Sequence, residues 1–105
     1  MNQTTESTWI VEELNRITRC VDFRHDRNFR TSATAVVDNL DMARHIIGAH
    51  GLKSVGAVEC LNAANLALDA MREDLNCLDS NLRRSFGDNI DDAQDTVRSL
   101  IFMAA

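Results

Sequence analysis

The sequence predicts an all-α protein, an antiparallel bundle of about four helices with one long central helix at about residues 54–86. The first observation is composition: the 105 residues include four glycines and neither proline nor tyrosine. Such a composition favours helices over strands. The second is an apolar register that steps by three and four, the spacing of a helix packed against other helices. Its members are Leu61, Ala64, Leu68, Met71, Leu75, Leu78 and Leu82.

The length suits a single helical domain over residues 1–105, in which we expect residues 1–6 to be a frayed polar tail. We predict the first helix at about residues 7–23, because apolar residues recur there at helical spacing. They are Ile10, Leu14, Ile17 and Val21.

The segment Arg24–Arg30 interrupts this pattern and carries three arginines, so we expect a loop between helices. Thr31 or Ser32 can cap the second helix. That helix should end near Gly48, because glycine is the residue that most often follows a helix.

The third helix should begin near Ser54, and no glycine or proline interrupts it between Gly56 and Gly87. Its predicted length is roughly 45 Å at about 1.5 Å per residue, about twice that of each other helix. The stretch Ala57–Met71 is apolar nearly all round, which predicts a helix surrounded by its neighbours. Gly87 should end it, and Asp88 should cap the fourth helix.

The net charge of −5 argues against general binding to nucleic acids or anionic membranes. The three cysteines form no CxxC pair, and no apolar leader or membrane-spanning run is present. We therefore expect a cytoplasmic protein with reduced thiols.

In a single chain, so long a helix either breaks near Asp79 and Ser80 or leaves its second half to be covered by a partner. We therefore expect a non-catalytic protein–protein interaction module that self-associates, most simply as a dimer, or binds a partner helix through an apolar face. The alternative is that the other helices of the same chain cover both halves. The candidate contact residues are Met71, Leu75, Leu78, Leu82 and Phe102.

A second candidate site surrounds His50, which Lys53 follows three residues later. This spacing resembles that of histidine phosphotransfer domains, which are four-helix bundles. The resemblance implies that His50 would carry the phosphoryl group and that Lys53 would steady it. Ser54 stands where the family has glycine. The alternative is an exposed histidine in a turn between helices.

The third candidate is nucleic-acid contact through Arg24, Arg27 and Arg30, with Phe29 as a stacking ring. The alternative is a solvated loop whose arginines pair with acidic helices.

No pair of cysteines or histidines has the spacing of metal ligands, and no nucleophile elbow or phosphate-binding loop occurs. We therefore expect no metal, no cofactor, no small-molecule substrate and no enzymatic activity.

Overall fold

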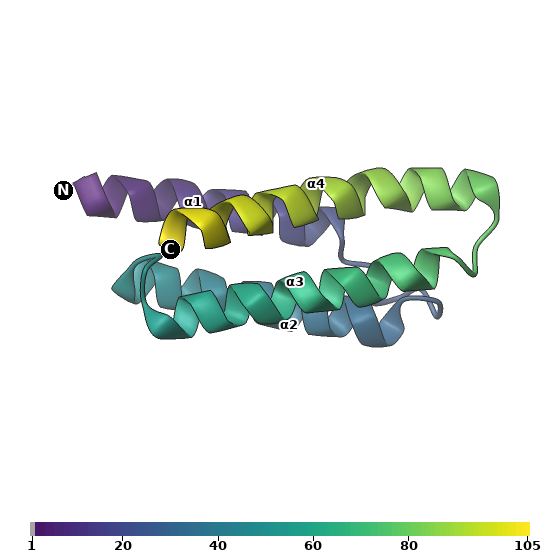
Figure 1. Ribbon diagram of the computed structural model, residues 1–105, viewed down its shortest axis with the longest axis horizontal. Coiled ribbons are helices and arrows are strands. Elements are labelled where there is room, and N and C mark those ends of the chain that lie inside the picture. The colour runs from purple at the N-terminus through teal and green to yellow at the C-terminus, as the bar shows by residue number, and fades with distance from the viewer. Residues whose placement is uncertain (1) are drawn as a thin grey trace.

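The computed structural model describes the backbone of residues 2–105 and the side chains of residues 7–29 and 31–105. This part of the chain forms four helices and no strands: α1 (Asn2–Cys20), α2 (Arg30–His50), α3 (Val55–Leu75) and α4 (Ser80–Ala104). Successive helices run antiparallel, and the bundle measures 48 × 23 × 19 Å (Figure 1). The predicted all-α, four-helix bundle is confirmed.

The predicted long helix over residues 54–86 is wrong, because α3 ends at Leu75 and the chain turns before α4. The turn contains asparagine and aspartate, which favour turns and helix starts. The side chain of Asp79 accepts a hydrogen bond from the backbone N–H of Leu82 at 3.1 Å and so caps α4. Gly87 and Asp88, the predicted boundary, lie inside α4.

The first two helices also begin earlier than predicted. The backbone of residues 2–6 belongs to α1 in place of the predicted tail, and Met1 lies outside the described residues. In α2 the N-cap position is Phe29, which makes no side-chain cap. The predicted cap Ser32 instead donates from its hydroxyl to Asp74 Oδ2 on α3 at 2.7 Å. Helix α2 continues past Gly48, and Gly51, with φ 90°, ends it.

The core lies along the axis of the bundle and contains the predicted apolar face of α1. On α3 the residues of the predicted register from Leu61 to Met71 are fully buried. Leu66 on the same helix is 68% exposed, so α3 is buried on one side and not surrounded. The residues of the predicted apolar face are Ile10, Leu14 and Ile17 on α1 and Val21 directly after it, and all four are fully buried.

A cluster of three phenylalanines closes the end of the bundle where α1 meets α2. The ring of Phe86 on α4 lies 4.7 Å from that of Phe23 and 5.1 Å from that of Phe29, measured between centroids. Both contacts have the edge-to-face geometry that aromatic pairs favour. The cluster therefore ties the α1–α2 loop to α4.

A buried amide fixes how α4 lies along α3. Gln94 is 1% exposed, and its Nε2 donates to Asp69 Oδ1 at 2.7 Å and to Asn65 Oδ1 at 3.1 Å. Its Oε1 accepts from Arg72 Nη2 at 2.6 Å. Because a shift along the axis would leave this buried amide without partners, the network specifies one register.

Candidate functional site

The structure separates the predicted contact residues into buried and exposed sets. Met71 is fully buried and Leu75 is 7% exposed, so both belong to the core. Leu78 is partly buried against the same core. Leu82 and Phe102 are 45% and 83% exposed. Because the chain turns after Leu75, α4 packs on α3, and the argument for a dimer based on an uncovered half of α3 does not apply.

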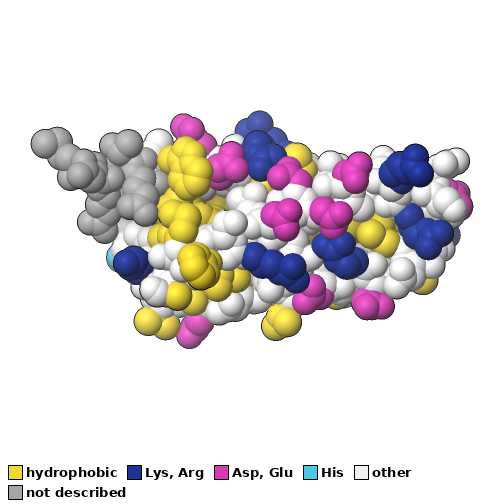
Figure 2. Space-filling view, turned by 45° about the horizontal axis from the view of Figure 1, so that its top comes forward, with side chains coloured by type: hydrophobic (Ala, Val, Ile, Leu, Met, Phe, Trp, Pro, Cys, Tyr) yellow, Lys and Arg dark blue, Asp and Glu magenta, His cyan; other side chains and the backbone are white. Residues whose placement is uncertain are grey.

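The exposed apolar side chains concentrate at the end of the bundle where α1 begins and α4 ends. Trp9 is 54% exposed, Phe102 83% and Met103 43%; we call these three residues the apolar patch. Figure 2 shows hydrophobic side chains gathered near this end of the molecule. Val55, at the start of α3, is 74% exposed at the same end (Figure 1).

A hollow of about 250 Å³ lies between α1 and α4 beside this patch; we call it the α1–α4 groove. Trp9 and Glu13 line one wall, four residues apart on α1. The other wall is formed by residues that recur every three or four positions on one face of α4. They are Asp95, Thr96, Ser99, Leu100 and Met103.

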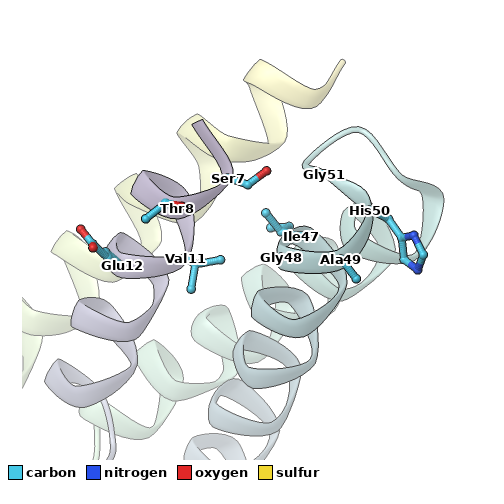
Figure 3. A pocket seen from close by; sticks show the side chains of 9 residues that line it. All are labelled: Ser7, Thr8, Val11, Glu12, Ile47, Gly48, Ala49, His50 and Gly51. Carbon is cyan, nitrogen blue, oxygen red and sulfur yellow. The ribbon is translucent and has the colours of Figure 1, made fainter. Parts of the chain in front are cut away.

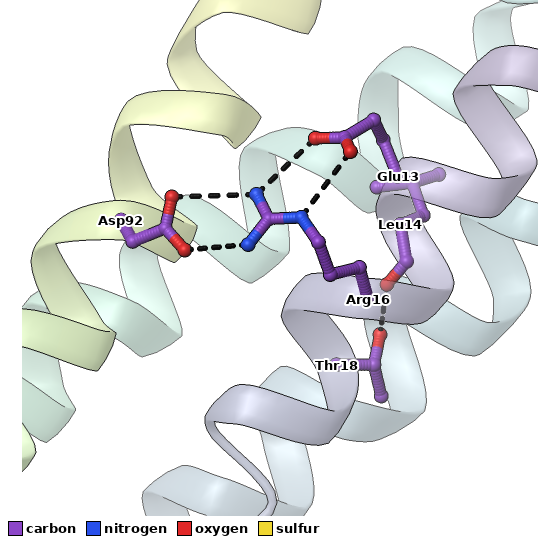
Figure 4. A network of polar contacts seen from close by, with 5 residues as sticks. All are labelled: Glu13, Leu14, Arg16, Thr18 and Asp92. Carbon is purple, nitrogen blue, oxygen red and sulfur yellow. Dashed lines mark hydrogen bonds and ion pairs between the residues drawn. The ribbon is translucent and has the colours of Figure 1, made fainter.

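Arg16 joins the two walls next to the groove (Figure 4). Its guanidinium donates to Asp92 Oδ2 on α4 at 2.7 Å and to Glu13 Oε1 on its own helix at 3.2 Å. The hydrogen bond from Arg16 lowers the pKa of Asp92 below its usual value. The Asp92 contact, followed by the Glu13 contact, raises the pKa of Arg16. The bridge therefore links α1 to α4 where the groove begins.

A larger hollow of about 640 Å³ lies between α1 and α2 (Figure 3). Its two ionisable lining residues, Glu12 and His50, point away from the hollow, whereas Val11 and Ile47 face it. Binding sites for small molecules combine an apolar lining with polar groups that converge on the ligand. No charged side chain of the described lining converges here, so this hollow is the weaker candidate.

The structure does not place His50 and Lys53 on one helical face. His50 is the last residue of α2, and Lys53 lies in the turn before α3. Both side chains are exposed. The predicted arrangement needs both residues on the same helix, because only there do positions three apart share a face. That geometry is therefore contradicted.

Residues 24–29 of the arginine-rich segment form the predicted loop, whereas Arg30 begins α2, and the predicted stacking ring is wrong. Phe29 is fully buried in the phenylalanine cluster and cannot stack on a base. Arg24 pairs with Asp22 at 2.6 Å, which lowers the pKa of that carboxyl. Arg27 is exposed, and the side chain of Arg30 lies outside the described residues.

Among the described residues, no group of three or more His, Cys, Asp or Glu side chains is placed to hold a metal ion. No helix in this part of the chain has both the length and the apolar character to cross a membrane. The sequence prediction named Phe102 but missed Trp9 and Met103. The sequence signal that could have identified them is helical spacing, which places Trp9 next to, and not on, the buried face of α1, and Met103 likewise on α4.

Fold and groove together define a small four-helix bundle with an apolar patch at one end. Comparisons with protein-family models, curated proteins and solved structures each found no match.

Proposed function

We propose that this protein is a small non-catalytic interaction module that binds a partner helix along the α1–α4 groove. The observation that carries the proposal is the exposure of Trp9, Phe102 and Met103 beside a hollow between two helices. Tryptophan and other large side chains supply most of the binding energy in protein interfaces. An amphipathic helix laid in a groove buries such residues by placing apolar side chains at every third or fourth position.

The size of the groove supports a protein partner. Its volume of about 250 Å³ is below the roughly 300–1,000 Å³ of sites that enclose a drug-sized ligand. It suits side chains that protrude from a helix.

The free thiols of Cys20, Cys60 and Cys77 support a reducing compartment, and we propose the cytoplasm.

Selection of helical peptides from a display library against the wild-type protein tests this proposal. The selected peptides should bind Phe102→Asp at least about tenfold more weakly, because a carboxylate would face their apolar side. The matched control is Met42→Asp. Met42 is 57% exposed on α2, whose backbone does not closely approach that of α4 in the described part of the chain.

Equal binding of the selected peptides to wild type and Phe102→Asp would contradict the proposal. Sedimentation equilibrium on the same proteins tests the self-associating version. A dimer that Phe102→Asp dissociates would identify the partner helix as a second copy of this chain.

A further inference from the structure

We infer that the helix recognised by the α1–α4 groove is cationic, with lysine or arginine side chains flanking its apolar positions. The inference rests on the proposed function and adds the charge of the partner.

Carboxylates dominate the charge around the groove. Glu13 and Asp92 share the single guanidinium of Arg16, which leaves an excess of negative charge at that bridge. Asp95 lines the groove opposite Trp9, and its exposed side chain forms no ion pair within the described part of the chain. A cationic side chain of a docked helix would find an unpaired carboxylate here, across the groove from an indole ring, a group that also attracts cations.

The end of α4 adds negative potential beside the apolar patch. The last carbonyl groups of a helix carry a partial negative charge, which lysine or arginine usually offsets. The last turn of α4, which carries Phe102 and Met103, contains no basic residue. Because α1 begins at this same end (Figure 1), the partial positive charge of its N-terminus opposes that of the α4 C-terminus, so the carboxylates of the side wall carry the preference for a cation.

The same charges argue against a second copy as the preferred occupant. In a symmetric dimer each groove would face its own counterpart, so Asp95 and its neighbouring carboxylates would meet like charges. Juxtaposed like charges disfavour a complex. The patch of three side chains is also small beside the roughly 800 Å² per partner of a stable interface.

Fluorescence provides a direct test, because Trp9 is the only tryptophan and tyrosine is absent. The probes are two synthetic helices that have leucine at the same positions. All the remaining positions are lysine in one helix and glutamate in the other. The lysine helix should shift the Trp9 emission to shorter wavelength and bind at least about tenfold more tightly than the glutamate helix. Added salt should weaken its binding.

Reversing the charge of Asp95 tests whether this residue is the source of the preference for the lysine helix. Asp95→Lys should weaken binding of the lysine helix by about three- to tenfold and strengthen binding of the glutamate helix. The matched control is Asp38→Lys, which makes the same change in net charge at an exposed position on α2. It should change both affinities less than twofold at moderate salt, because screening limits the reach of surface charges.

Equal affinity for the two helices, or equal effects of Asp95→Lys and Asp38→Lys, would overturn the inference. The proposed function would still stand if Phe102→Asp abolished binding of both helices. If neither helix bound, the inference would be overturned, and the display selection would decide the proposed function separately.

Discussion

At the residue scale, two phenylalanines of α4 have opposite surroundings. Phe86 packs edge-to-face on Phe23 and Phe29, whereas Phe102 is 83% exposed. Phe86 therefore contributes to the stability of the bundle at one end of α4, whereas Phe102 is available for binding at the other end. Substituting each by alanine separates these two contributions.

Phe86→Ala should lower the free energy of unfolding by about 2–3 kcal/mol, less than the about 3–5 kcal/mol of a fully buried phenylalanine, because Phe86 is only partly buried. Phe102→Ala should change it by less than about 0.5 kcal/mol, as exposed positions usually do. Urea unfolding followed by circular dichroism measures both. Equal losses at the two positions would show that Phe102 is packed in solution.

The Arg16 bridge predicts a stability difference that depends on pH. The folded protein holds the pKa of Asp92 below its unfolded value. Its contribution is thus fully present above the unfolded pKa of about 4 and is lost as the pH falls through the folded pKa. With side chains 45% and 46% exposed, the contribution should not exceed about 1 kcal/mol.

Asp92→Asn should therefore be less stable than wild type at pH 7, and the difference should shrink as the pH falls below about 4. Urea unfolding at a series of pH values measures it, with Asp38→Asn as the exposed control. A difference that persists unchanged at low pH would show that Asp92 acts through something other than its charge.

At the scale of the elements, the start of α4 decides the topology. Asp79 caps the helix through the backbone N–H of Leu82. Asp79→Ala should lower the free energy of unfolding by about 0.5–2 kcal/mol, whereas Asp79→Asn should retain the cap. Asp88→Ala is the control, because Asp88 lies inside α4 and alanine favours a helix interior. If Asp88→Ala were the costlier change, the helix would begin at Asp88.

The sequence was sufficient for the helical class and most of the core, but not for this boundary. The register from Leu61 to Leu82 continues through the turn without a change of spacing, so periodicity alone cannot detect the break. Gly87 is the residue at which the sequence predicts the end of the helix, yet a glycine inside a helix lowers its stability by only about 1 kcal/mol. A Cβ at Gly87 would lie 3.7 Å from Leu75 Cδ1, so the packing there does not require glycine. The residues that indicate the turn in the sequence are Asn76 and Asp79.

The candidate site was less predictable than the fold. Phe102 follows Ile101 and precedes Met103 in an apolar run, and helical spacing alone does not show which of these residues a neighbouring helix covers. Trp9 on α1 and Met103 on α4 line the same groove because of how the first and last helices meet. Their proximity joins residues nearly a whole chain apart and follows only from the assembled bundle.

At the scale of the whole molecule, the turn after Leu75 lets one chain cover its own apolar register. Leu75→Asp would bury an unpaired carboxylate, since Leu75 is 7% exposed, and should unfold much of the bundle. Leu82→Asp, at a position 45% exposed, should retain the helical circular dichroism signal and change stability by less than about 1 kcal/mol. Sedimentation equilibrium should give Leu82→Asp the same mass as wild type. A folded Leu75→Asp with reduced mass would instead place this register in an interface between two chains.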